Sequence, residues 1–254
     1  MKVHRPYDPG ILKGVRGLAQ GLILACGALA CAPAWASPGN TAWSSIYDPG
    51  YGEPTYSVMA VSGGIAYSAS PSPFSGDPGS NADIRLRAFD IPTGALLWED
   101  VWDASTRSLD DSVSDIAASA GRVFITAIGG SNSDQPPTPF WVVRAYAGSS
   151  GTVLWEDRCP SGHASRVTAT STWVYVLGAC SDGTDEVARV RAYATATGKL
   201  RWEIRIPNML ATNAITLSND RLVVACIDTS EALVLRAYDI KRGKFLWQRK
   251  PQTP

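Results

Sequence analysis

Few side chains in this sequence could carry out chemistry. After residue 36 there is a single histidine, His163 in CPSGHAS. No Ser-His-Asp or Cys-His arrangement of the kind that nucleophilic catalysis requires can be assembled around it from repeated or clustered partners. The acidic loops 75–83 (SGDPGSNAD) and 180–186 (CSDGTDE) could hold a cation through oxygen ligands, but neither has the alternating Asp spacing of a dedicated calcium loop. We therefore predict no catalytic residue and no metal site, with polar turns at both loops and His163 exposed in a loop.

Three cysteines follow residue 36: Cys159, Cys180 and Cys226. Their spacing matches no zinc pattern, and an odd number leaves at least one thiol over. An oxidising compartment would permit one disulfide; otherwise all three act as small buried hydrophobic side chains. The sequence leaves the disulfide state open.

The first 36 residues are predicted to be a signal peptide. Lys13 and Arg16 precede an apolar run at 17–32, and Ala34-Trp35-Ala36 supplies a small-x-small cleavage pattern. The run is too short for a comfortable membrane span, which needs about 20 apolar residues, so no transmembrane span is expected in the mature chain. A lipoprotein site at Cys26 or Cys31 is the minor alternative. We expect an exported protein, periplasmic or extracellular.

The composition of the remaining chain narrows the class of protein. Of the whole sequence, 45% is apolar and only 18% is charged, with 23 Gly and 9 Trp, which suits a turn-rich all-β domain. Residues 37–254 contain 19 basic and 22 acidic residues, a net charge of −3. Since no basic stripe remains to attract a phosphate backbone, nucleic-acid binding is not expected.

One phrase occurs four times: RAFDIPTGALLWE (87–99), RAYAGSSGTVLWE (144–156), RAYATATGKLRWE (191–203) and RAYDIKRGKFLWQ (236–248). In each copy a Gly follows the Ala by six residues and a Trp follows the Gly by four, and successive Trp residues are 57, 47 and 45 residues apart. Periods of this size are typical of propellers and solenoids. The frame residues are Ala88, Gly94, Trp98; Ala145, Gly151, Trp155; Ala192, Gly198, Trp202; and Ala237, Gly243, Trp247.

Two further strands are predicted upstream of each phrase, joined by a short turn of Gly, Ser, Asn or Asp type. One unit therefore holds four antiparallel strands in meander order, and the expected blades lie at about 55–100, 112–157, 164–204 and 212–249. When such sheets stack, each indole needs a flat slot on its neighbour, which Ala and Gly provide, and its N–H can reach a backbone carbonyl. The fold class is all-β, a β-propeller of four four-stranded blades.

The frame A-x-[DA]-x-x-x-G-x-x-x-W resembles the tryptophan-docking repeat of the PQQ-like, or quinoprotein dehydrogenase-like, β-propeller family, which also includes the outer-membrane assembly lipoprotein BamB. Family members usually close a ring of seven or eight blades, whereas this sequence has four units. The stretch 38–48 (PGNTAWSSIYD) places Gly39 and Trp43 in register as a fifth final strand. Three arrangements stay open: a closed four-bladed ring, a half-propeller arc that pairs with a second copy, or a truncated product of a longer gene.

The resemblance also bears on cofactors. Dehydrogenases of this family bind PQQ stacked on a Trp and capped by a disulfide between adjacent cysteines, with a Glu/Asn/Asp calcium site. This sequence has no adjacent cysteine pair, and no calcium ligand or catalytic Asp can be matched to a position in it. We expect neither PQQ nor calcium; a truncated or divergent PQQ-dependent dehydrogenase is the alternative.

An arginine precedes each repeat alanine, and a glutamate follows the tryptophan in three of the four copies. A hairpin between them would form cross-strand ion pairs on a solvated face; the alternative is a ring of arginines that binds an anion or a peptide. The residues are Arg87, Arg144, Arg191 and Arg236, with Glu99, Glu156 and Glu203.

Two longer loops, 69–83 and 128–141, are the first candidates for a partner surface, because binding residues tend to lie on loops of rigid scaffolds. Their candidate residues are Phe74, Asp77, Phe140 and Trp141. We predict a non-catalytic protein-binding or scaffolding module, with self-association into a larger propeller as one possible mode of binding.

Overall fold

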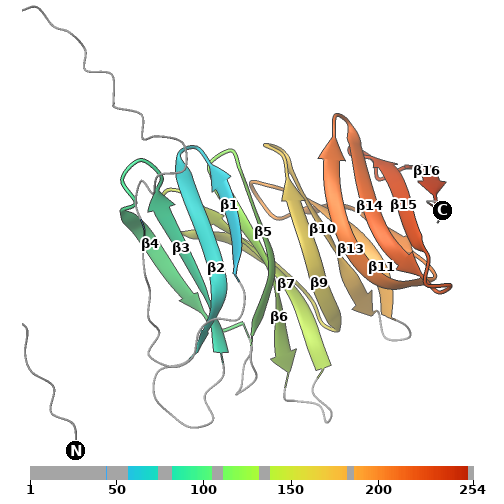
Figure 1. The fold of residues 1–254 in the computed structure, drawn as a ribbon, viewed down its shortest axis with the longest axis horizontal. Coiled ribbons are helices and arrows are strands. Elements are labelled where there is room, and N and C mark those ends of the chain that lie inside the picture. The colour runs from blue at the N-terminus through green and yellow to red at the C-terminus, as the bar shows by residue number, and fades with distance from the viewer. Residues whose placement is uncertain are drawn as a thin grey trace, which may run out of the picture. The chain divides into compact units, whose positions relative to one another are not determined.

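The computed structural model describes residue 44 and residues 57–73, 82–104, 111–131, 138–181 and 186–250. These residues form sixteen strands and no helix (Figure 1). The chain divides into compact units at residues 1–42 and 43–254, and all sixteen strands lie in the second. The predicted signal peptide and the fifth-copy residues Gly39 and Trp43 lie outside the described residues.

The strands form four separate four-stranded antiparallel sheets, which we call blades 1 to 4, and in each the strands pair in chain order. This arrangement confirms the predicted all-β fold of four meander units. Blade 1 contains β1 (Val58–Ser62), β2 (Ile65–Pro73), β3 (Ala82–Asp90) and β4 (Leu96–Trp102). Blade 2 contains β5 (Ser112–Ser119), β6 (Arg122–Ser131), β7 (Thr138–Ala147) and β8 (Val153–Cys159). Blade 3 contains β9 (Gly162–Ala169), β10 (Trp173–Ser181), β11 (Glu186–Ala194) and β12 (Leu200–Ile206), and blade 4 contains β13 (Met209–Ser218), β14 (Arg221–Asp228), β15 (Leu233–Asp239) and β16 (Phe245–Arg249).

The repeated phrase forms the last hairpin of each blade. In blade 3, Ala192 pairs with Trp202, and a register shift follows directly after the alanine. Gly198 lies in the turn at a φ of +67°, a conformation that glycine adopts without a steric penalty, and its N–H donates to the carbonyl of Ala194 at 2.9 Å. The same shift after the repeat alanine occurs in the other three blades, so the Ala–Gly–Trp spacing encodes one bulged hairpin.

The four blades lie side by side in chain order (Figure 1). The first strands of consecutive blades are neighbours, β1 with β5, β5 with β9 and β9 with β13. Three clusters of buried side chains hold the blades together, one each between blades 1 and 2, 2 and 3, and 3 and 4. None of these clusters contains residues of both blade 1 and blade 4, so the described residues correspond to an open row of blades.

Candidate functional site

The boundaries between consecutive blades, which we call seams, are built around the repeat tryptophans. The Trp98 indole lies against Gly151 of the next blade, and its Nε1 donates to the carbonyl of Gly148 at 2.7 Å. Trp155 makes the same contacts with Gly198 and with the carbonyl of Thr195, at 2.9 Å. A Cβ added at Gly198 would lie 2.6 Å from the Trp155 ring, so both the turn and the indole exclude a side chain there.

The third seam repeats this arrangement. The Trp202 indole lies against Gly243, and its Nε1 donates to the carbonyl of Ile240 at 3.3 Å. Trp247 holds the corresponding position in blade 4, after which no further described blade follows. Three of the four repeat tryptophans therefore stabilise a seam between described blades.

The predicted arginine–glutamate pairs form in the first three blades. Arg87 bonds Glu99 at 2.5 Å, Arg144 bonds Glu156 at 2.7 Å, and Arg191 bonds Glu203 at 2.6 Å. The three arginine side chains are only 15–17% exposed, so the pairs are more buried than a solvated face implies. Arg87, Arg144 and Arg191 are thus each paired with a glutamate of the same hairpin. This arrangement favours the predicted ion pairs over a ring of arginines that binds an anion or a peptide.

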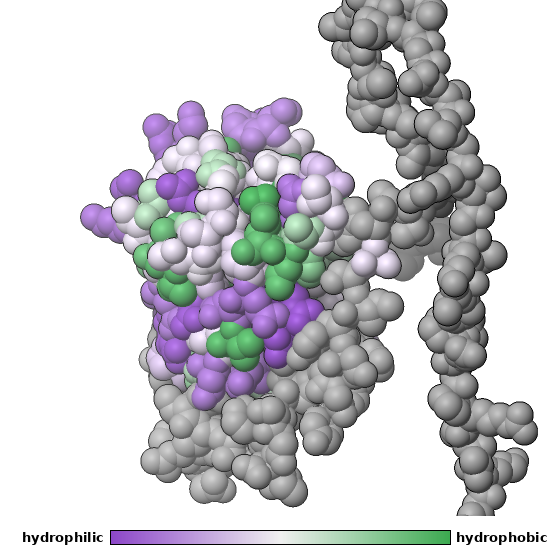
Figure 2. Space-filling view, turned by 90° about the vertical axis from the view of Figure 1, so that its left-hand side faces the viewer, coloured by the Kyte–Doolittle hydropathy of each residue, from purple (hydrophilic) through white to green (hydrophobic). Residues whose placement is uncertain are grey.

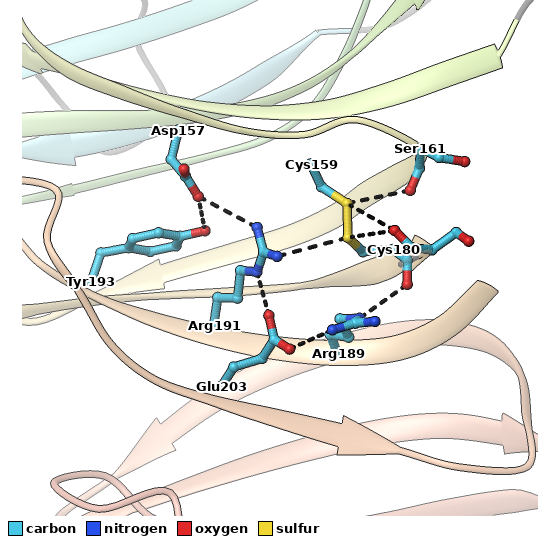
Figure 3. A network of polar contacts seen from close by, with 9 residues as sticks. Asp157, Cys159, Ser161, Cys180, Arg189, Arg191, Tyr193 and Glu203 are labelled. Atoms are coloured by element: carbon cyan, nitrogen blue, oxygen red, sulfur yellow. Dashed lines mark hydrogen bonds and ion pairs between the residues drawn. A yellow bond between two sulfur atoms is a disulfide. The ribbon is translucent and has the colours of Figure 1, made fainter. Parts of the chain in front are cut away.

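A second set of polar contacts crosses the seam between blades 2 and 3 (Figure 3). The Asp157 carboxylate accepts a hydrogen bond from the Tyr193 hydroxyl at 2.7 Å. It also forms an ion pair with the Arg191 guanidinium, with 3.4 Å between nitrogen and oxygen. Burial and the Asp157 charge raise the pKa of Tyr193. Burial alone would raise the pKa of Glu203, but hydrogen bonds from Arg191 and Arg189 hold it below its ordinary value. Glu203 is therefore ionised and the Tyr193 hydroxyl keeps its proton at neutral pH, and the hydrogen bonds and ion pairs of the network join the two blades.

A disulfide joins the same two blades. Cys159 at the end of β8 is bonded to Cys180 in β10 (Figure 3), which settles the alternatives that the sequence leaves open for these two residues. Cys226 is a free buried thiol, and burial raises its pKa to about 11. The disulfide spans two blades, so it does not have the adjacent-cysteine form that caps PQQ in the resembling dehydrogenases.

Two expectations about candidate binding residues are corrected by the structure. His163 lies within β9, opposite Ala179, and is half-buried, whereas an exposed loop position was expected. Phe140 and Trp141 belong to β7 and are 8% and 0% exposed, so they pack in the core and offer no partner surface. Phe74 and Asp77 lie outside the described residues. The sequence does contain a signal that Trp141 is a core residue. Trp141 lies four residues before the repeat alanine, and blade 1 has another apolar residue, Ile84, at the same position, where it is buried.

Sequence reasoning also missed a group of three carboxylates. Asp83, Asp103 and Asp111 have carboxylate oxygens within 4.8 Å of one another, and Asp111 is buried. Burial, and then the charge of Asp103, raise the pKa of Asp83. Such oxygens are the ligands that calcium prefers, but acidic side chains often gather without an ion, and we assign no metal to them.

The outer side of blade 4 differs from every seam. In β10 and β11 the side chains that point toward the next blade, such as Tyr175, Leu177 and Val190, are completely buried. The corresponding side chains of blade 4 are half-buried or exposed because no described blade covers them. We call this surface the open face; it consists of Val223, Ala225, Ile227, Leu233, Leu235 and Trp247.

The opposite end of the row is more polar. Strand alternation directs Ala66, Ser68 and Arg85 of blade 1 away from blade 2. Figure 2 views this side and shows a hydrophilic band beside separate apolar patches. Met59 and Val61 of β1 are exposed by 66% and 61%. The two ends therefore differ in chemistry, and the continuous apolar sheet surface is at blade 4.

Comparisons with known proteins bear on this architecture. A family model described as "Outer membrane protein assembly factor BamB" matches residues 140–254. No curated protein matches the sequence. The matched residues run from β7 to the end of the chain, less than half of its length. Together with the four antiparallel sheets, the match supports the predicted resemblance to PQQ-like β-propeller repeat proteins.

Solved structures of BamB and of two quinohemoprotein alcohol dehydrogenases match this chain. BamB from Moraxella catarrhalis is 19% identical, with 75% of this chain and 60% of that chain covered and a TM-score of 0.41. Quinohemoprotein alcohol dehydrogenase ADHIIG from Pseudomonas putida HK5 is 15% identical, with 76% and 34% covered and a TM-score of 0.51. The quinohemoprotein alcohol dehydrogenase from Comamonas testosteroni is 14% identical, with 78% and 36% covered and a TM-score of 0.50.

These likenesses concern the fold, because identities are low and a propeller hosts many unrelated functions. The chain spans less than two thirds of the length of each of these structures. Among the described residues, no helix is both long and apolar enough to cross a membrane.

Proposed function

We propose that this chain is an exported, non-catalytic protein-binding or scaffolding module of the cell envelope, with tryptophan-docking repeats as its framework. The open face of blade 4 carries the proposal. Apolar sheet surfaces left uncovered are typical of sites of protein interaction. Each seam in this molecule also shows what such a face accepts, namely the neighbouring sheet with its glycine turn and aromatic side chains.

Two observations support export. The disulfide between Cys159 and Cys180 is of the kind that persists in oxidising compartments. The match to the BamB family model over residues 140–254 is consistent with a periplasmic or envelope location. The N-terminal pattern of basic residues, apolar run and Ala34-Trp35-Ala36 agrees with both.

The docking role can be tested by site-specific photo-crosslinking. A photoreactive residue at position 233, where Leu233 is 42% exposed on the open face, should give an adduct of defined mass in cells that produce the chain. The matched control is position 200, because Leu200 is 44% exposed but lies at the start of β12, outside the open face.

The mass of the adduct identifies the partner. An adduct of twice the chain mass indicates a second copy, and any other defined mass indicates a different protein. Both results support the proposal. Equal crosslinking at positions 200 and 233, or none at position 233, would contradict it.

The absence of quinone chemistry is a separate prediction. The residues that the resemblance associates with PQQ are not assembled among the described residues, and the one disulfide joins two blades. PQQ with calcium at saturating concentration should therefore raise the melting temperature by less than about 1 °C, because only a ligand that binds the native state stabilises it. A clear, concentration-dependent rise would instead favour a portion of a PQQ-dependent dehydrogenase.

A further inference from the structure

A cavity opens at the seam between blades 3 and 4. Its volume is about 210 Å³, and it is lined by His163, Ala179 and Ala188 from blade 3 and by Met209, Leu210, Ala211 and Thr212 from blade 4. Most of these side chains are apolar. Polar atoms also contribute to the exposed lining, and the hydroxyl of Thr212 is hydrogen-bonded to Ser165 at 2.7 Å. The lining therefore suits a flat ring that carries a polar N–H group.

The repeat explains why the cavity lies at this seam. Ala188 stands four residues before the repeat alanine, opposite Ala179. In blade 2 this position is Trp141, opposite Ile128, and its indole is completely buried against Gly178 of blade 3. At the seam between blades 3 and 4 the chain therefore has a methyl group where the preceding seam has an indole.

We propose that this cavity binds an indole-sized aromatic group, either as a free small molecule or as the tryptophan side chain of another polypeptide. A cavity volume of about 150 Å³ is enough to hold benzene, so this half-open pocket of about 210 Å³ has room for a flat bicyclic ring. The cavity adjoins Ala188, and the equivalent residue of blade 2 is Trp141. The indole of Trp141 therefore indicates the shape of group that such a seam can hold. The cavity lies at the seam between blades 3 and 4, whereas the open face is on the outer side of blade 4. Failure of the aromatic-binding proposal would therefore not contradict protein docking on the open face, and the reverse also holds.

The binding test uses fluorine NMR, because the nine tryptophans of the chain give no signal there. Two probes distinguish the sources: 5-fluoroindole alone, and a blocked Gly-Gly-Trp-Gly-Gly peptide labelled with 5-fluorotryptophan. We expect saturable binding to the full chain. Similar affinities of the two probes indicate a free small molecule, and at least tenfold tighter binding of the peptide indicates a partner polypeptide.

Two substitutions on one strand locate the probe. Met209→Trp places an indole at a half-buried position of the lining that packs toward blade 3, and should weaken binding at least tenfold. Ala214→Trp adds the same side chain at an exposed position of β13, away from the lining, and should leave binding within twofold. Melting curves verify that both variants fold. No binding by the wild type, unchanged binding by Met209→Trp, or equal loss in both variants would overturn the proposal.

Discussion

Replacing Trp155 by alanine should lower the free energy of unfolding by about 3–5 kcal/mol, the usual cost of truncating a large buried aromatic side chain. The indole is 9% exposed and lies between Phe124 and Tyr193, with ring centres 6.0 and 5.7 Å away. Its removal leaves a cavity at the seam, and the Thr195 carbonyl loses the hydrogen bond that the indole N–H donates to it. Urea unfolding followed by circular dichroism measures the change.

Trp247→Ala is the matched control. Trp247 has the same place in its hairpin, pairing with Ala237 as Trp155 pairs with Ala145. It is only half-buried, and its indole donates no hydrogen bond to any described residue. We expect a loss below about 1 kcal/mol, because no further blade of the described residues packs against this side chain. Equal losses in the two variants would show that tryptophans act within their own hairpins rather than across seams.

The fold could be predicted because the repeat records constraints that are local in the chain. A glycine six residues after the alanine is required by the turn, and Gly94, Gly151, Gly198 and Gly243 all have φ near +70°. The tryptophan four residues further on is set by the hairpin register. Four copies of a local constraint predict four blades, whatever the intervening sequence contains.

The arrangement of the blades was less predictable, because no local pattern encodes whether the first and last sheets meet. The packing of Ile215 and Leu217 toward blade 3 leaves the other side of blade 4 uncovered. In sequence, Val223 and Leu235 look like the core residues of any other blade. Only the absence of a neighbouring described sheet turns these positions into the open face.

The prediction that Phe140 and Trp141 form a partner surface was wrong, because a polar loop in the sequence does not reveal where the next strand begins. Phe140 and Trp141 follow a Pro- and Ser-rich stretch, yet they begin the alternating run of β7 and pack in the core. The cavity at the last seam depends on Ala188 replacing a tryptophan, a difference between copies that appears only when the blades are aligned by register. Function is therefore expected where the copies differ.

Removal of the disulfide should have the second large effect. Cys159 and Cys180 are 21 residues apart, and closing a loop of that length restricts the unfolded chain enough to stabilise the fold by about 3 kcal/mol. The double substitution Cys159→Ala and Cys180→Ala should lower the urea midpoint accordingly. The bond also links β8 to β10 beside the Asp157–Arg191 ion pair, so the loss should fall mainly on the seam between blades 2 and 3.

The reductant dependence of stability separates the bond from the packing of its sulfur atoms. Wild-type protein should lose stability when the disulfide is reduced, whereas the double variant should be insensitive to reductant. Cys226→Ala is the control: its thiol is free and buried, so the substitution costs packing, but the remaining sensitivity to reductant should equal that of the wild type. If the wild type unfolds at the same urea concentration with and without complete reduction, the disulfide does not stabilise the seam. In that case Asp157, Arg191 and the tryptophan contacts would hold blades 2 and 3 together.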